Sequence, residues 1–444
     1  MTAPTASLGR GRPDAVTALT IFLVALIVGP LGQAGTPAEI IGMVTLAVWL
    51  ISMISMIGSG ARRHRPREPI RIFGWLFVIA VGISYVAANS RAMFSAEAHS
   101  ADAGLLLVCS WMGILLLAMD RIPSRERLDV LLRRLALLAG ALATLGLLQF
   151  ATKTPFTNYL QVPGLTQNAS LVGLYGRGGL TRPSGTAVHP IEFGAVLTMA
   201  LPIALHYAFT DLHRPLLHRW YPVAAIAFAV PISLSRSAVL SVLVVLCFMI
   251  PMWPRIVRRR AYLAIVAVCG AVYVIVPGLI GTITNLFTSI SSDSSAQSRT
   301  GSFALAYDFI GRSPIIGRGF LTFLPAYRIL DDQYLGLLIE TGIVGLIAFL
   351  GLLGSGVIGG VRLKKVCPNR TDGRLAVALA ASAASALASF ALFDAFSFPM
   401  AASLIFLVLG CTGALRRLVL LGQAGSPAIG SRANIHYQPL VADP

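Results

Sequence analysis

Charged residues are scarce in this sequence, and that scarcity sets the class of the protein. Only 12% of the 444 residues are Asp, Glu, Lys or Arg, whereas 56% are hydrophobic and the mean hydropathy is +0.77. In an ordinary soluble domain about a quarter of the residues are charged. The composition excludes a typical soluble domain and predicts an all-α, polytopic integral membrane protein.

Cysteine is also sparse, and its positions do not suit a disulfide framework or a zinc site. The five cysteines form no CxxC pair and fall in predicted spans or inner turns: Cys109, Cys247, Cys269, Cys367 and Cys411. Disulfides need cysteines in an oxidising compartment, and zinc sites need closely spaced ligands. We therefore expect no disulfides and no metal site.

Long apolar runs recur along the whole chain. A hydrocarbon core of roughly 30 Å takes about 20 helical residues to cross. We predict about twelve spans, near 15–32, 38–58, 72–89, 102–119, 130–150, 190–210, 220–234, 237–254, 261–281, 334–360, 374–393 and 399–418. The first run lacks a small-residue cleavage site and is interpreted as a retained helix. Residues 1–444 then form a single membrane domain.

Basic residues gather in alternate turns of this arrangement. Clusters at 61–71, 120–134, 211–220, 254–260, 361–365 and 415–417 all fall on one side. Short loops rich in Lys and Arg stay in the cytoplasm, so both termini are predicted to be cytoplasmic. The bias of 32 Arg to 3 Lys is expected of a high-GC bacterial genome. The net charge of +17 follows mostly from topology, and we expect membrane lipids but no nucleic acid as partners.

Two predicted extracytoplasmic loops, 151–189 and 282–333, are much longer than the others. In the second, Phe303, Ala306, Tyr307 and Ile310 fall at helical spacing and predict a short amphipathic helix between Arg299 and Arg312. The glycines of IIGRGFLTF (315–323) would let the backbone approach a ligand closely. Residues 419–444 lack an apolar period and predict a flexible cytoplasmic tail.

Arg236 lies in an unusual place, within the apex ISLSRSAVLSVL. The preceding run of about 15 apolar residues contains Pro231 and spans roughly 22 Å, which is less than the hydrocarbon core. We therefore expect Arg236 below the outer surface, where a charge costs several kcal/mol unless it faces a partner or a water-filled cavity. The alternative is that its side chain snorkels to the outer headgroups.

Two further polar groups lie on the same predicted face. Arg182, His189 and Glu192 occur together in TRPSGTAVHPIEFG, where the first large loop enters a span. The i, i+3 spacing of His189 and Glu192 lets both point one way, although a packed, hydrogen-bonded helix entry explains them equally well. Asp331 and Asp332 stand at the mouth of another span, where helix capping is the alternative to a chemical role.

The order of these motifs resembles a known family. RPSGTAVHP is followed by a Ser-Arg-Ser apex, then PIIGRG in a long outer loop, then a polar pair before YLGLLIETGIVGLIAFL. Across roughly residues 135–360 this is similar to the O-antigen ligase and polymerase superfamily of bacterial membrane glycosyltransferases. The resemblance implies a GT-C-like membrane fold with two larger extracytoplasmic loops.

The resemblance also implies a reaction. The donor would be a glycan on undecaprenyl diphosphate, an acceptor hydroxyl would attack its anomeric carbon, and no metal or cofactor would be used. Arginines would then stabilise the diphosphate leaving group. By position, Arg182, Arg236 and Arg299 match the family's outer arginines, with Arg318 next. Many ligases carry a histidine before the YL pair, where this chain has Asp331-Asp332-Gln333.

The sequence leaves the general base and the acceptor open. Asp331, Asp332, His189 and Glu192 are all candidate bases. We favour a polymerase that extends a surface polysaccharide, with ligation to a lipid or protein acceptor as the alternative. A transporter or flippase also fits twelve spans, but the two halves of the chain show no similarity and the polar groups gather at the outer face. A scaffold role would not require an arginine apex below the surface.

Overall fold

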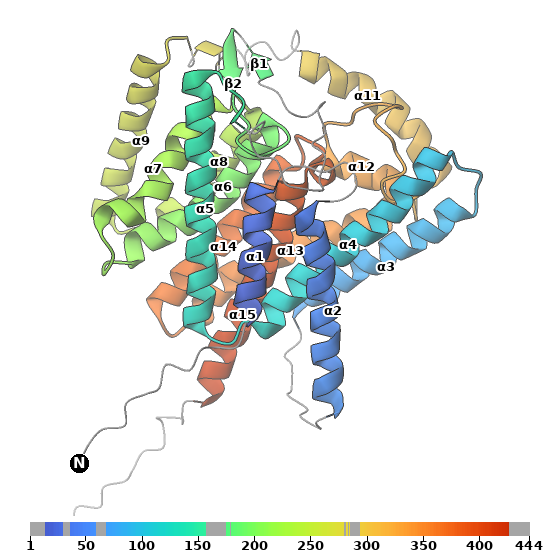
Figure 1. Cartoon of the computed structure of the whole chain (residues 1–444), viewed down its shortest axis with the longest axis horizontal. Coiled ribbons are helices and arrows are strands. Elements are labelled where there is room, and N and C mark those ends of the chain that lie inside the picture. The colour runs from blue at the N-terminus through green and yellow to red at the C-terminus, as the bar shows by residue number, and fades with distance from the viewer. Residues whose placement is uncertain are drawn as a thin grey trace, which may run out of the picture.

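The computed structural model describes residues 14–29, 36–58, 68–156, 175–177, 179–278, 281–282, 284 and 294–425, which form helices and one short hairpin (Figure 1). The helices are α1 Ala15–Val28, α2 Pro37–Gly58, α3 Pro69–Asn89, α4 Ser95–Arg121, α5 Arg125–Thr152, α6 Pro190–Thr210, α7 Leu216–Ile232, α8 Arg236–Met249, α9 Arg255–Ile275, α11 Ser294–Arg312, α12 Gln333–Glu340, α13 Gly342–Val366, α14 Arg370–Ser389 and α15 Pro399–Gly425, with 3-10 turns η3 Ile250–Met252 and η4 Ala395–Ser397. The hairpin pairs β1 Tyr175–Arg177 with β2 Leu180–Arg182.

Seven of the described helices are long and apolar enough to cross a membrane: α2, α3, α4, α5, α6, α13 and α15. Three shorter apolar helices, α1, α7 and α8 with η3, have 10–17 residues. Helices α9 and α14 both begin with arginines, which lowers their hydropathy. The polytopic, helical class is confirmed, whereas the count of twelve spans and the GT-C-like arrangement stay predictions.

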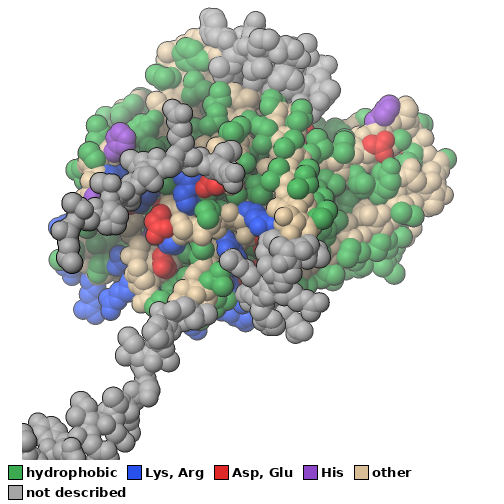
Figure 2. Space-filling model, turned by 60° about the horizontal axis from the view of Figure 1, so that its bottom comes forward, with side chains coloured by type: hydrophobic (Ala, Val, Ile, Leu, Met, Phe, Trp, Pro, Cys, Tyr) green, Lys and Arg blue, Asp and Glu red, His purple; other side chains and the backbone are tan. Residues whose placement is uncertain are grey.

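Ion pairs join segments that the sequence analysis placed on one side of the membrane. They are Arg127 with Asp14, Arg133 with Asp211, Arg125 with Asp372, Arg71 with Asp120 and Arg416 with Glu68. The start of α1 and the C-terminal half of α15 therefore lie at the same end of the bundle, the lower end in Figure 1. Figure 2 turns this end forward and shows Lys and Arg side chains over it. That this end faces the cytoplasm stays a prediction.

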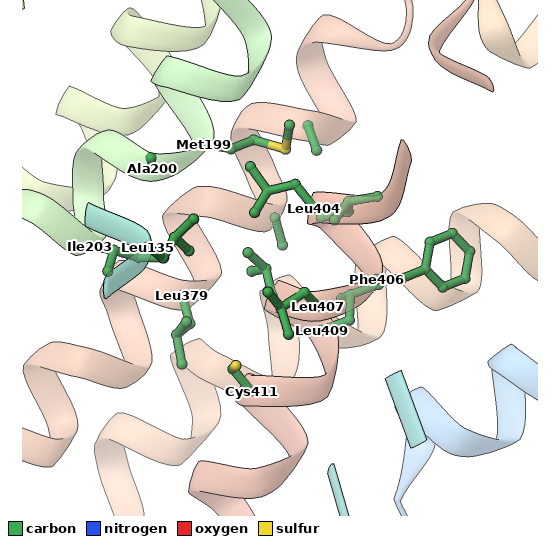
Figure 3. Close-up of a cluster of buried hydrophobic side chains, with 14 of the residues drawn as sticks. Leu135, Met199, Ala200, Ile203, Leu379, Leu404, Phe406, Leu407, Leu409 and Cys411 are labelled. Carbon is green, nitrogen blue, oxygen red and sulfur yellow. The ribbon is translucent and has the colours of Figure 1, made fainter. Parts of the chain in front are cut away.

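Helix α6 is the centre of the bundle. It packs against α5, α7, α8, α14 and α15, and 89% of its apolar window is buried. Figure 3 shows Ile203 beside Leu135 of α5 and Met199 near Leu404 of α15. The small side chains of α14 allow this helix to approach α6 closely. At their contact the Ser382 hydroxyl donates to the Met199 carbonyl at 2.6 Å. The polar groups at the two ends of α6 are thereby held on a rigid element.

The predicted single span 334–360 is broken. Helix α12 ends at Glu340 and α13 begins at Gly342, whose φ is +64°. The reason is a backbone pairing with the preceding loop: Arg318 N donates to the Ile339 carbonyl at 3.1 Å, and Ile343 N donates to the Pro314 carbonyl at 2.9 Å. In a continuous helix the Ile343 N–H would donate to the Ile339 carbonyl, and here both groups bond to the loop instead.

The glycines of the IIGRG stretch serve this pairing. Gly317 has φ +71°, and a Cβ at that position would lie 2.2 Å from the backbone of Glu340. A Cβ on Gly342 would lie 2.3 Å from the backbone of Ile315. Among the described neighbours, the close approach that these two glycines permit is therefore between two protein backbones, and an approach to a ligand stays a prediction.

The predicted loops are partly revised. The described part of loop 151–189 contains the hairpin, and α5 runs on to Thr152. Helix α11 lies in loop 282–333 and ends at Arg312, while its amphipathic, extracytoplasmic character stays a prediction. Arg299 lies within α11, and its side chain lies outside what the structure describes. Residues 419–425 of the predicted tail continue α15, so the tail cannot begin before the end of that helix, and 426–444 lie outside the described residues.

Candidate functional site

Arg182 ends strand β2 and points into the protein. The hairpin pairs it with Tyr175, and the residue is only 7% exposed. Its Nε donates to the carbonyl of Ser233 at 2.9 Å. A loop arginine is thus bound to the apex between α7 and α8, which lies about 50 residues further along the chain.

The apex itself has an unusual backbone. Leu234 has φ +48° although it carries a side chain, and it is buried at 1% exposure. The hydroxyls of Ser235 and Ser237 lie 2.8 Å apart within hydrogen-bond reach. Arg236 is half-buried and is the first residue of α8. The structure therefore brings the apex of Arg236 to Arg182, as the sequence predicted that both would lie on one face.

The N-terminus of α8 adds to the electrostatics of this place. The cap residue Ser235 makes no side-chain hydrogen bond to the first turn of the helix. The first backbone N–H groups of a helix and its macrodipole favour an anion. The Arg182 side chain and the N-terminus of α8, which begins at Arg236, thus lie at the same end of the bundle.

His189 stands beside Arg182 as the N-cap of α6. Its Nδ1 accepts from Ile191 N at 3.2 Å, and its ring lies 4.5 Å from the Tyr175 ring between centroids. Burial and the positive charge of Arg182 lower the pKa of His189 to about 4. The imidazole is therefore neutral at pH 7, and its proton resides on Nε2 because Nδ1 is an acceptor.

Glu192 is fully buried and bonded to backbone amides. One carboxylate oxygen accepts from Val188 N at 2.9 Å, and the other accepts from Met400 N at 2.7 Å and Ala401 N at 3.3 Å. Met400 and Ala401 lie in the first turn of α15, so Glu192 caps that helix from α6. These bonds fit the alternative interpretation, in which Glu192 is a packed, hydrogen-bonded residue at a helix entry. A role of Glu192 as the base stays a prediction.

The Asp331-Asp332-Gln333 stretch begins α12. Asp332 Oδ1 accepts from Tyr334 N at 2.9 Å and Leu335 N at 3.2 Å, so the capping interpretation is confirmed for Asp332. Gln333 is 2% exposed, donates its N–H to the Phe390 carbonyl at 2.9 Å and accepts from Phe396 N at 2.7 Å. Asp331 is half-buried and precedes the cap.

Asp394 is a candidate that the sequence reasoning missed. It lies between α14 and α15, where it accepts a hydrogen bond from the Ser397 hydroxyl. Burial raises the pKa of Asp394 to about 6, the Ser397 bond opposes this, and the negative charge of Asp331 raises it further. The sequence pointed to Asp394 only through a single carboxylate in the otherwise apolar turn LFDAFSFP.

Arg318 belongs to a separate polar cluster. Its guanidinium pairs with Glu97 at the start of α4, and it lies 4.6 Å from the Phe309 ring centroid. Arg91 and Tyr327 also bond to Glu97, at 2.8 and 2.7 Å. The predicted role of Arg318 in diphosphate binding stays a prediction, and the contacts described here tie its loop to α4.

No group of three or more His, Cys, Asp or Glu side chains within the described part of the chain is arranged to hold a metal ion. A protein-family model described as O-antigen ligase matches residues 221–350 of the chain. No curated protein matches the chain significantly. The matched segment contains Arg236, Arg318, Asp331 and Asp332, and it is narrower than the 135–360 that the motifs suggested. This match confirms the predicted resemblance to the O-antigen ligase and polymerase superfamily over residues 221–350.

Proposed function

We propose that this protein is a membrane glycosyltransferase of surface polysaccharide biosynthesis that moves a glycan from undecaprenyl diphosphate to an acceptor hydroxyl. The reaction takes place at the outer face of the bacterial inner membrane and uses no metal. The observation that carries the proposal is the hydrogen bond from Arg182 Nε to the Ser233 carbonyl, three residues before Arg236. It ties Arg182 to the apex that precedes Arg236 and the N-terminus of α8.

Such a group of positive charges suits a diphosphate leaving group. As the bond from the anomeric carbon to the diphosphate oxygen breaks, negative charge grows on that oxygen. Arginine binds phosphate oxygens through a planar fork, and a low-dielectric setting strengthens the interaction. In this mechanism Arg182 and Arg236 hold the diphosphate, and the first amides of α8 face the same charge.

We propose Asp331 as the general base, because it belongs to the Asp331-Asp332-Gln333 stretch that stands where many ligases carry a histidine. Asp332 and Glu192 are engaged in capping helices, and the Nδ1 of His189 is occupied by Ile191 N. In the proposed step the acceptor hydroxyl gives its proton to Asp331 while its oxygen attacks the anomeric carbon. The bonding electrons of the broken C–O bond leave with the diphosphate, so atoms and charge balance.

Extension of a polysaccharide and ligation of a finished chain use the same chemistry on different acceptors. The description of the matching family model favours ligation. The aspartate pair in place of the histidine expected for many ligases is the reason to keep extension as the first candidate.

The test uses the purified full-length protein in liposomes with a short undecaprenyl-diphosphate-linked glycan, with and without a chelator. Mass spectrometry of a ladder of longer lipid-linked glycans would support a polymerase, and transfer of one unit to a second acceptor would support a ligase. Loss of transfer with the chelator would contradict metal independence. Movement of the donor across the membrane without transfer would favour the flippase alternative and sink the proposal.

A further inference from the structure

A cavity lies at the end of the bundle opposite the candidate site. It has a volume of about 150 Å³ and is bordered by the ends of α6, α8, α9 and α14. Thr210 at this end of α6 adjoins Asp211, which pairs with Arg133, so the cavity is at the end where the inner-turn ion pairs gather. The residues that the argument uses are Phe209, Met249, Met252, Trp253, Val257 and Arg374.

The walls of the cavity are aromatic and thioether side chains. The Phe209 ring lies 5.2 Å from the Trp253 ring and 5.1 Å from the Trp220 ring between centroids. Met249 and Met252 complete the wall, and methionine adapts its shape to irregular apolar ligands. Trp at the level of a membrane interface combines an apolar body with a polar edge. This lining fits a hydrocarbon chain.

The rim of the cavity is basic. Arg374 lines the cavity and is exposed. Arg258 donates to the carbonyl of Trp253, a lining residue, at 3.4 Å. Further arginines, Arg255, Arg259 and Arg260, begin α9 beside it. The nearby acidic groups already have arginine partners, since Asp372 pairs with Arg125 and Asp211 pairs with Arg133. The rim therefore carries an excess of positive charge.

Helix α9 leaves this place open to the bilayer. Val272 is the one buried residue among the described side chains of α9, and apolar residues such as Leu263 and Val266 are 69% and 68% exposed. In a membrane these side chains face lipid, so a lipid can reach the cavity from the side.

We propose that this cavity binds an anionic phospholipid, with part of an acyl chain between Phe209 and Trp253 and its phosphate at Arg374 and Arg258. Charge complementarity selects the headgroup, because each arginine near the membrane surface attracts an anionic lipid by about 1 kcal/mol. The site is separate from the diphosphate site and does not depend on the proposed reaction.

The test is native mass spectrometry of the full-length protein after delipidation in detergent, with phosphatidylglycerol, cardiolipin or phosphatidylcholine added back. The anionic lipids are expected to remain bound and phosphatidylcholine is not. Arg374→Gln should lower the apparent affinity about fivefold, which corresponds to one lost surface charge. Val257→Trp should fill the cavity and displace the lipid. Arg362→Gln removes another exposed arginine, near the C-terminal end of α13, and is the matched control.

Two results would overturn the proposal. Equal retention of phosphatidylcholine and the anionic lipids would remove the selectivity that the arginine rim provides. Equal effects of Arg374→Gln and Arg362→Gln, or undiminished binding to a folded Val257→Trp variant, would mean that lipid binds by general surface charge and not in the cavity.

Discussion

Replacing Arg182 separates the chemical role of this residue from its structural one. In Arg182→Ala the Ser233 carbonyl loses the hydrogen bond from Arg182 Nε, and Ser233 is fully buried. An unsatisfied buried acceptor costs about 1–3 kcal/mol. Arg182→Lys keeps the positive charge but cannot keep the planar fork on phosphate. We therefore expect a measurable fall in melting temperature for the alanine variant and a smaller one for lysine.

The loss of activity should be larger than the loss of stability predicts. If Arg182 holds the leaving diphosphate, removing it should lower the turnover rate by about 10²–10³-fold, as loss of one preorganised donor does elsewhere. The lysine variant should fall between the alanine variant and the unmodified protein. The assay is the initial rate of glycan transfer in liposomes, measured on protein that elutes as a single species and melts cooperatively.

The control is Arg133→Ala at the opposite end of the bundle. Arg133 is 27% exposed and bonds to both oxygens of Asp211 at 2.6 and 2.7 Å, so its loss also breaks a partly buried contact. It should lower the melting temperature and leave the transfer rate of the folded protein nearly unchanged. If Arg182→Lys turned over at the normal rate, or if Arg133→Ala lost as much activity as Arg182→Ala, the reasoning would be refuted.

The remaining predictions concern the loop pairing and the carboxylates. Gly317→Ala should destabilise the protein by at least about 1–2 kcal/mol, because φ is +71° and the new Cβ meets backbone at 2.2 Å, whereas Gly354→Ala meets nothing within 4 Å and should be neutral or stabilising in thermal unfolding. Asp331→Asn should abolish transfer in the liposome assay while Asp332→Asn mainly lowers the melting temperature, and the reverse order would make Asp332 the base. Because the pKa of Asp394 is raised from 3.8 to about 6, a second negative charge develops beside Asp331 as the pH rises through 6, so the transfer rate should rise there. The same shift stabilises the folded chain as the pH falls from about 6 toward 4, and Asp394→Asn should remove both effects; an unchanged pH–rate profile would exclude Asp394 from the site.

Patterns that repeat within one segment were enough to predict the helices. Apolar runs located α6 and α15, and the charged clusters located the turns that the ion pairs of Arg127 and Arg416 now join. The sequence predicted only that Arg182 and Arg236 share a membrane face, because alternating spans carry every second turn to the same end; it did not predict the bond from Arg182 to Ser233.

Contacts between distant backbones escaped prediction. The sequence from 334 to 350 has the hydropathy of one continuous helix, and the break at Gly342 arises because the loop at 314–319 supplies other partners for its backbone. The capping of α15 by Glu192 could not be predicted either, since 208 positions separate the carboxylate from Met400 N. Asp394 was missed because a single carboxylate in a short turn has no periodic signature.

The bond between Glu192 and the start of α15 has a consequence for biogenesis. Helix α6 enters the membrane well before residues 399–401 have been made, so until then the carboxylate lacks the two amide donors from Met400 and Ala401. A chain in which α15 has not yet been inserted therefore leaves one carboxylate oxygen of Glu192 without these two donors. Insertion of α15 supplies those donors and completes the packing around α6. The hydrogen bonding at the start of α6, where the candidate site lies, is therefore complete only once α15 is in place.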